Sequence, residues 1–491
     1  MSMTVSTTSG EVRGQEDGGV TRFLGIPYAA SPTGDLRFRA PVPPPAWDGV
    51  LDASAFSATP PKPDYPPPLD VMLPEPNIPG ENWLTLNVWT PGGAGLPVMV
   101  WIHGGAFSHG NSAAAVYDGR AFARDGVVLV TINYRLGVDG FAVLPDAPAN
   151  RGLLDQIAAL EWVRDNIAAF GGDPGNVTIF GESAGAMSVT TLLSIPRARG
   201  LFARAITQSG AAQAAADPAD AALVTKELGR ALGLEATAAN LAGVPLAALI
   251  GAQTIVRDAL AAQPDPARFG VSIVASAIPF PPVIDGDLIP RQPLAAIVAG
   301  EAADVPLLTG TTSDEFRLFL VPTGRAAFVT DDLLAALLPV LGISPPVAEL
   351  YRSHRPGATP GDLLAALLTD SYFRLPALAV AEARTGPAPT FVYEFAWPSP
   401  VGGLGACHAM DIPFVFDNLA ADGVDRLTGP QAPPQLAAQM HAAWVSFARA
   451  GDPGWRPFGM DYPVFVFRES GGTLELDPRG DERAIWRQPG A

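Results

Sequence analysis

The sequence has a single cysteine, Cys407, among its 491 residues, so no disulfide can form within the chain. This excludes the disulfide-dense secreted scaffolds and favours a reducing compartment, the cytoplasm. Residues 1–14 are polar and lack the basic and apolar regions of a signal peptide, which agrees with that location. Because no second thiol can resolve an oxidised Cys407, it is predicted to be a packing residue.

Positive charge is also scarce: 31 Lys and Arg residues stand against 49 Asp and Glu, which gives a formal net charge of −18 at pH 7. No basic run of the kind that binds nucleic acid or an anionic membrane occurs, so neither partner is expected. No stretch approaches about 18 consecutive apolar residues, so a membrane-spanning helix is not expected either. With 48% apolar residues, the chain can bury a large core.

Short apolar runs alternate with helical segments through the chain. The runs at residues 97–102, 127–133 and 177–180 are apolar at nearly every position, as expected for strands covered on both faces. Residues 153–170 have apolar side chains near a 3.6-residue spacing and end at two glycines, which predicts an amphipathic helix. The pattern continues with strands at 203–207, 305–308 and 391–395 and helices at 221–232 and 435–448. It predicts an α/β fold with a mostly parallel sheet.

The segment at residues 59–80, TPPKPDYPPPLDVMLPEPNIPG, is rich in proline. Such a composition also occurs in linkers between domains. Residues 11–56, however, are too few and too irregular to form an independent α/β domain. We therefore expect one domain over residues 1–491, with 59–80 as a long surface loop.

Residues 181–185, GESAG, match the G-x-S-x-G nucleophile elbow. The motif follows the predicted strand at 177–180 and precedes a helix-compatible run at 186–193, which is the context that the elbow requires. Glycine at both flanks suits a tight turn in which larger side chains would collide with neighbouring backbone. The alternative is a helix start that is capped by serine. The context favours Ser183 as a nucleophile.

A serine nucleophile needs a base, and the base needs an orienting carboxylate. In the fold that carries this elbow the base comes last in the chain, and three of the five histidines follow Ser183. His354 lies in a polar stretch and His441 in a predicted helix, so both are expected to be surface or packing residues. His408 follows a Gly-rich loop and precedes an apolar run, and it is the predicted base.

Two adjacent acidic residues, Asp314 and Glu315, are candidates for the orienting carboxylate. Both follow the predicted strand at 305–308, and ligands in such folds bind beyond the carboxyl ends of the strands. Sequence spacing does not choose between them.

Residues 103–107, HGGAF, follow the predicted strand at 97–102, as the HGGG-type loop does in lipases and esterases. A plain Gly-rich turn is the alternative. Small residues would let the N–H groups of Gly105 and Ala106 approach a substrate oxyanion, together with that of Ala184.

With these motifs in place, the chain resembles the type-B carboxylesterase family of α/β hydrolases, which includes cholinesterases and bacterial p-nitrobenzyl esterases. The likeness covers nearly the whole chain. It rests on FLGIPYA at 23–29, LRF at 36–38, ENWLTLNVWTP at 81–91, WIHGGAF at 101–107, NYR at 133–135, NRGLLDQ at 150–156, FGGDPGNVTIFGESAGA at 170–186 and QSG at 208–210. The resemblance implies an α/β-hydrolase fold, a monomer or weak homo-oligomer, a small-molecule ester substrate and no cofactor or metal.

The resemblance also implies a role for each site residue. The family's G-T-N-x-x-E pattern falls on GTTSDE at 310–315, which selects Glu315 over Asp314 as the acid beside Ser183 and His408. Further positions implied by the likeness are oxyanion donors at Gly105, Ala106 and Ala184, residues that help to order the triad at Glu182 and Ser209, and structural ion pairs of Arg37 with Glu81 and of Arg135 with Asp173.

The chain departs from the family at residues 81–84, ENWL, where the family carries a cysteine that closes a loop. We hypothesise that the prolines of 59–80 replace this crosslink by restricting the unfolded chain. The corresponding loop borders the gorge in the family, so residues 59–80 are hypothesised to form the gorge rim and to gate substrate entry. Two alternatives to an esterase are a non-catalytic binding protein of the same family and an amide or carbamate hydrolase with the same triad.

Overall fold

The structure is a computed structural model that describes residues 2–212 and 215–487. Residue 1, residues 213–214 and residues 488–491 of the predicted domain lie outside it. Its strands are β1 (Ser2–Ser6), β2 (Glu11–Asp17), β3 (Val20–Pro27), β4 (Val50–Asp52), β5 (Thr85–Thr90), β6 (Leu96–Ile102), β7 (Val128–Ile132), β8 (Gly172–Glu182), β9 (Arg204–Gln208), β10 (Leu307–Thr312), β11 (Thr390–Phe395), β12 (Pro463–Phe467) and β13 (Thr473–Leu476).

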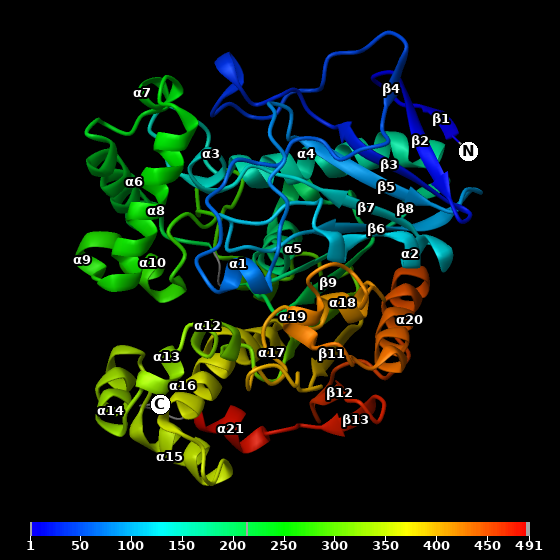
Figure 1. The fold of residues 1–491 in the computed structure, drawn as a ribbon. Coiled ribbons are helices and arrows are strands. Elements are labelled where there is room, and N and C mark those ends of the chain that lie inside the picture. The colour runs from blue at the N-terminus through cyan, green and yellow to red at the C-terminus, as the bar shows by residue number, and fades with distance from the viewer. Residues whose placement is uncertain (1, 213–214, 488–491) are drawn as a thin grey trace.

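All of these strands belong to one sheet, which runs from the N-terminal strands to the C-terminal strands (Figure 1). The strand order is β1-β2-β3-β5-β7-β6-β8-β9-β10-β11-β12-β13, and β4 pairs with β2. The seven strands from β7 to β12 in this order are each parallel to their neighbours, whereas β1, β2, β3, β5 and β13 pair in antiparallel fashion at the two edges. The predicted α/β fold with a mostly parallel sheet is confirmed.

Helices cover both faces of the sheet, and the strand residues divide between them. Val98, Val100 and Ile102 of β6 belong to the core that contains α4 (Arg151–Asn166) and α5 (Ala184–Ser194). The alternate residues of β6, Met99 and Trp101, belong to a second core, which contains α2 (Arg120–Arg124) and α20 (Pro434–Ala450). A strand with two apolar cores has no solvent face, which is why its sequence is apolar at almost every position.

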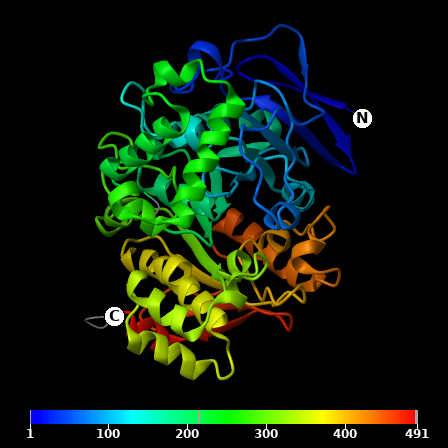
Figure 2. The same cartoon turned by 60° about the vertical axis from the view of Figure 1, so that its left-hand side comes forward.

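Most of the remaining helices lie in two insertions between the strands. After β9 come α6 (Pro218–Leu232), α7 (Ala238–Ala242), α8 (Leu246–Ala262), α9 (Pro266–Phe269), α10 (Val271–Ser276) and α11 (Pro293–Val298). After β10 come α12 (Arg317–Leu320), α13 (Arg325–Phe328), α14 (Asp331–Val340), α15 (Pro345–His354), α16 (Pro360–Thr369) and α17 (Leu375–Ala383). Figure 2 shows the helices of these two insertions as separate groups, one above the other.

Short helical elements complete the chain. They are α1 (Leu69–Met72), α3 (Gly137–Phe141), α18 (Ile412–Val415), α19 (Asp425–Thr428), α21 (Gly480–Ile485), the 3-10 turns η1 (Gly34–Leu36), η2 (Ala115–Tyr117), η3 (Ile167–Phe170) and η4 (Pro196–Ala198), and the π-helical η5 (Asp370–Arg374). Because η5 joins α16 to α17, residues Pro360–Ala383 form one helical stretch of 24 residues whose length and composition would allow it to cross a membrane. Of its most apolar window, 67% is buried inside the protein, as in the core helix of a globular domain.

Both ion pairs implied by the family resemblance are wrong. Arg135 pairs with Asp155 of α4, Nη2 to Oδ1 at 2.7 Å, and not with Asp173. Asp173 lies at the amino end of β8, whereas Arg135 follows the carboxyl end of β7, so the two residues lie at opposite edges of a parallel sheet. Arg37 pairs with Asp139 of α3 at 3.2 Å.

Glu81, the partner that the resemblance implied for Arg37, is exposed to solvent. A carboxylate in that position gains little from an ion pair, because water already solvates it.

Candidate active site

The residues predicted for catalysis gather at the carboxyl edge of the parallel strands. β6 ends at Ile102, directly before HGGAF, and β8 ends at Glu182, directly before Ser183. β10 ends at Thr312, three residues before Glu315. Because parallel strands end at the same edge, segments that are far apart in the sequence meet there.

Ser183 lies between β8 and α5 in a backbone conformation that residues other than glycine rarely adopt, with φ +55° and ψ −124°. Its N–H group donates to the carbonyl of Gln208 at 2.9 Å. The flanking glycines leave room for β6: a Cβ atom on Gly181 or Gly185 would lie 2.5 Å or 2.0 Å from the carbonyl oxygen of Ile102. The tight strand-turn-helix geometry expected of GESAG is therefore present, and both glycines are needed for it.

His408 and Glu315 form a buried pair. Nδ1 of His408 lies 2.6 Å from Oε2 of Glu315, and Oε1 of the same carboxylate accepts the N–H group of Thr312 at 2.8 Å. The carboxylate of Asp314 is not paired with His408; it accepts hydrogen bonds from the hydroxyl of Ser313 and the N–H group of Ala406. Residue spacing leaves the two acids open and the family resemblance selects Glu315, which is the acid that contacts the histidine in the structure.

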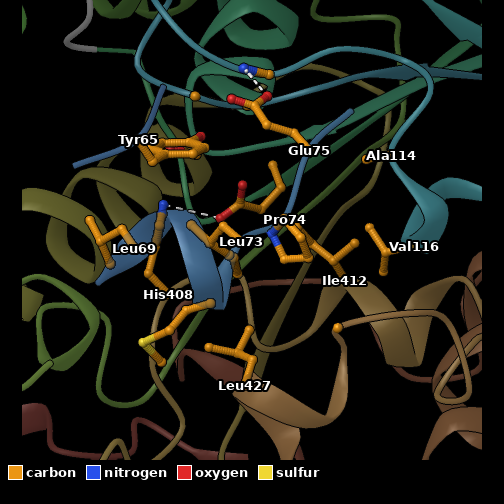
Figure 3. Close-up of a pocket in the computed structure, with 18 of the residues that line it drawn as sticks. Tyr65, Leu69, Leu73, Pro74, Glu75, Ala114, Val116, His408, Ile412 and Leu427 are labelled. Atoms are coloured by element: carbon orange, nitrogen blue, oxygen red, sulfur yellow. Dashed lines mark hydrogen bonds and ion pairs between the residues drawn. The ribbon is translucent and has the colours of Figure 1, made fainter. Parts of the chain in front are cut away.

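The other ring nitrogen of His408, Nε2, lies 3.1 Å from Oε1 of Glu182; this is the dashed line that starts at His408 in Figure 3. Burial raises the pKa of Glu182 to about 8, and the nearby carboxyls of Asp411 and Glu315 act in the same direction. Burial lowers the pKa of His408, but the carboxyls of Glu182 and Glu315 outweigh it and raise the pKa. The carboxylate form of Glu182 and the imidazolium form of His408 stabilise each other, whereas a neutral Glu182 does not attract the imidazolium.

The predicted oxyanion loop is held in an unusual backbone conformation. Gly105, Ala106 and Phe107 have φ values of +110°, +52° and +57°. The carbonyl of Gly105 accepts the N–H groups of Ser108 and His109 at 2.9 Å and 2.8 Å. Within the described residues, the N–H groups of Gly105 and Ala106 make no hydrogen bond. They are available to a ligand.

Ala184 is the first residue of α5, where an N–H group has no acceptor within the helix.

Two other residues singled out by the sequence do not line the cavity. Ser209 is fully buried, but its hydroxyl has no hydrogen-bonding partner among the described residues, so its ordering role stays a prediction. Cys407 is fully buried, and burial raises the pKa of its thiol well above its usual value, as expected for a packing residue.

The two histidines that the sequence set aside lie outside the site. His354 contacts Asp481 and Glu482, and His441 contacts the carbonyl of Val415. Neither residue lines the cavity that contains His408. In the part of the chain that the structure describes, no group of three or more His, Cys, Asp or Glu side chains is arranged to hold a metal ion.

A cavity of about 190 Å³ opens in front of Ser183 and His408. Much of its wall is apolar, and includes Leu69, Met72, Leu73, Val116, Phe319, Ile412 and Leu427. Its acidic lining residues are Glu75, Glu182 and Asp422, and no Lys or Arg is among the described residues that line it. The lining is therefore suited to an uncharged organic ligand.

Part of this wall comes from the Pro-rich loop 59–80. Figure 3 shows Tyr65, Leu69, Leu73, Pro74 and Glu75 around the same cavity as His408. The hypothesis that this loop forms the rim of the site agrees with this arrangement. Sequence reasoning did not identify the individual residues, because a proline-rich loop has no hydrophobic period that would show which side chains point inward. A lone glutamate among prolines was the only available signal for Glu75.

Comparison with known proteins decides the family. The family model described as the carboxylesterase family matches residues 1–484 of the chain. The chain belongs to the carboxylesterase family. Among similar proteins, the para-nitrobenzyl esterase of Bacillus subtilis (strain 168) is 38% identical over 495 residues, which cover 98% of this chain and 97% of the relative. The phenmedipham hydrolase of Pseudarthrobacter oxydans is 35% identical, and 96% of each chain is covered.

Solved structures agree with this carboxylesterase assignment. A Geobacillus stearothermophilus carboxylesterase matches with a TM-score of 0.85 at 38% identity, over 99% of this chain and 100% of that chain. The family resemblance and the α/β-hydrolase fold predicted from the motifs are confirmed. This carboxylesterase is a carboxylic ester hydrolase, which sets aside the non-catalytic alternative.

Proposed function

We propose that this carboxylesterase cleaves uncharged carboxylic esters through an acyl-enzyme intermediate, with Ser183, His408 and Glu315 as its triad. The observation that carries the proposal is the hydrogen-bonded pair of His408 and Glu315 in the same cavity as Ser183, which lies on a strained turn. Glu315 fixes the imidazole with Nδ1 toward the carboxylate, so the lone pair of Nε2 is left for the serine proton.

In the first half of the reaction, Oγ of Ser183 attacks the ester carbonyl carbon and Nε2 of His408 takes the hydroxyl proton. The carbonyl oxygen becomes an oxyanion, which the N–H groups of Gly105, Ala106 and Ala184 would bind. His408 then gives its proton to the departing alcohol as the acyl-enzyme forms. In the second half, a water molecule attacks the carbonyl carbon of the acyl-enzyme while His408 takes its proton. His408 then returns the proton to Oγ of Ser183 as the bond to the acyl group breaks, and the carboxylic acid leaves.

Glu182 would act on the charged form of the base. When His408 carries the proton it is an imidazolium, and it then has the Glu315 carboxylate at Nδ1 and the Glu182 carboxyl near Nε2. We propose that Glu182 helps to hold the imidazolium during the reaction, although it does not itself take the serine proton. The charge on the imidazolium lowers the pKa of Glu182, so the carboxyl ionises most readily in the state that it stabilises.

The charges around the cavity predict which acyl groups are accepted. We expect the p-nitrophenyl ester of butyric acid to have at least about a tenfold higher kcat/KM than the hemisuccinate ester, because the second carboxylate would enter a cavity whose described lining includes Glu75, Glu182 and Asp422 but no Lys or Arg. Burial raises the pKa of Glu75 to about 7 and that of Glu182 to about 8, so both groups are neutral below these values and negative above them. The preference for butyrate should therefore increase from pH 6 to pH 9.

The p-nitrophenyl ester of monomethyl succinate is the matched control, because it has a longer acyl chain without the charge. Poor turnover of this ester would attribute the discrimination to size. Equal kcat/KM for butyrate and hemisuccinate, or a preference that shrinks with rising pH, would contradict the proposed substrate class.

Labelling with a fluorophosphonate tests the nucleophile directly. We expect one equivalent of the reagent to be bound covalently and the modified peptide to contain Ser183, because the reagent requires an activated serine. Butyrate ester should protect the protein from labelling. Modification of a different residue, or none, would overturn the proposal. A matched p-nitroanilide measures the amide alternative: the proposal expects the ester to be turned over faster.

A further inference from the structure

The Pro-rich loop 59–80 is hydrogen-bonded to the segment that follows the predicted oxyanion loop. Oε2 of Glu75 accepts the N–H group of Gly110 at 2.8 Å. The side-chain amide of Asn111 donates to the carbonyl of Pro76 at 3.0 Å. The second half of the loop is therefore tied to residues 110–111 through two well-formed hydrogen bonds.

The first half of the loop contacts the same segment. Nδ1 of His109 lies 3.1 Å from the carbonyl oxygen of Pro63, and the His109 ring stacks on Tyr65 with ring centres 4.3 Å apart. Residues 109–111 are thus held between the two halves of the loop.

A shift of Gly110 would displace the predicted oxyanion loop, because the backbone of Gly110 contacts this loop. A Cβ atom on Gly110 would lie 2.3 Å from Nδ1 of His103 and 2.4 Å from the carbonyl oxygen of Gly104. A Cβ atom on Gly105 would lie 2.3 Å from the carbonyl oxygen of His109. These segments are closely packed through their backbone atoms, so a shift of Gly110 would move the N–H donor of Gly105 as well.

Lys62 keeps the Glu75 carboxyl compatible with its buried location. Nζ of Lys62 lies 3.9 Å from Oε2 of Glu75, and the two side chains are 4% and 13% exposed. Neither Nζ of Lys62 nor Oε1 of Glu75 makes a hydrogen bond in the described part of the chain. The hydrogen bond to Gly110 is consequently the main short contact of this carboxyl group, and the lysine contributes charge compensation.

We propose that Glu75 is a positioning residue for the oxyanion hole: its hydrogen bond to Gly110 sets the position of the Gly105 and Ala106 N–H donors. The inference rests on the proposed function, since it assumes that these donors bind the oxyanion. A residue that acts in this way affects the transition state more than the bound ester, because the charge on the oxygen develops only during the reaction. Its loss should lower kcat and leave KM nearly unchanged.

Two substitutions separate the hydrogen bond from the charge. Glu75→Asp keeps the negative charge beside Lys62 but withdraws the acceptor from Gly110 by one methylene. Glu75→Gln removes the charge but keeps a carbonyl oxygen for the Gly110 N–H group. Since one oxyanion donor is worth roughly 10²–10³ in kcat, we expect Glu75→Asp to lower kcat for p-nitrophenyl butyrate by about tenfold or more. Glu75→Gln should retain most of the kcat and lose thermal stability instead.

Affinity for a trifluoromethyl ketone, which forms a tetrahedral adduct with an active serine, gives an independent readout. Its inhibition constant should rise in Glu75→Asp by the same factor as kcat falls, whereas a merely structural role would lower kcat and leave the inhibition constant unchanged. Asp70→Asn is the matched control, since Asp70 is an exposed acid of the same loop. It should behave as the parent enzyme does.

The inference falls if Glu75→Asp keeps the parent kcat, if it raises KM alone, or if Glu75→Gln loses as much kcat as Glu75→Asp. The last outcome would assign the effect to charge. Failure of the proposed function has a different signature, namely turnover that survives replacement of Ser183. In that case the nucleophile is wrong, whatever the Glu75 variants do.

Discussion

Replacing Ser183 with alanine should lower kcat for p-nitrophenyl butyrate by a factor on the order of 10³ or more, with little change in KM. The hydroxyl is the proposed nucleophile, and no other Ser, Thr or Cys is among the described residues that line the cavity. The remaining turnover would come from the oxyanion donors and from substrate binding. Steady-state kinetics on purified protein, with circular dichroism to confirm folding, measure this result.

Ser188→Ala is the matched control. Ser188 lies in the same helix, α5, and is also buried, but its hydroxyl contacts Gln156 and does not line the cavity. It should keep the parent activity. Comparable activity in the Ser183 and Ser188 variants would show that Ser183 is not the nucleophile.

Glu315→Gln should have a comparably large effect, a loss of about 10³–10⁴-fold in kcat, as expected when the orienting carboxylate of a triad becomes an amide. The amide has nearly the same shape and can still fill the buried site. It carries no charge to compensate the imidazolium, and its NH₂ group favours the wrong tautomer of His408. Turnover of p-nitrophenyl butyrate between pH 6 and pH 9 is the measurement.

The adjacent acid provides the comparison. Asp314→Asn should cost less than about tenfold, because Asp314 accepts hydrogen bonds from Ser313 and Ala406 and makes no contact with the histidine. If the asparagine variant at 314 were the more damaged of the two, the proposed acid would be Asp314 and the pairing with Glu315 would be structural only.

The central sheet was predictable from the sequence because each of its inner strands is covered on both faces. Such strands are apolar at successive residues, so the runs at 97–102, 127–133 and 177–180 correspond to β6, β7 and β8. The elbow was predictable because five consecutive residues carry its motif, although the backbone contact that requires glycine at 181 and 185 comes from β6. Sequence reasoning therefore worked where neighbouring residues carry the signal.

Contacts between distant segments were not predictable from residue spacing, and only the family resemblance selected Glu315. Asp314 and Glu315 follow the same strand, and only the path of the chain to His408 decides which of them meets the ring. The pairing of Arg135 with Asp155 depends on how α4 packs beside β7, and motif spacing carries no information on this. The contact of Glu75 with Gly110 depends on how a long loop folds back over the sheet.

The close contact of Gly181 and Gly185 with the Ile102 carbonyl has a consequence for how the enzyme can change over evolution. The turn that carries the proposed nucleophile and the strand that leads into the oxyanion loop touch through backbone atoms, so their spacing does not depend on any variable side chain. The apolar wall, in contrast, is built from side chains of loops and short helices. Substrate preference can therefore be altered by exchanging these side chains while the reacting geometry is inherited unchanged.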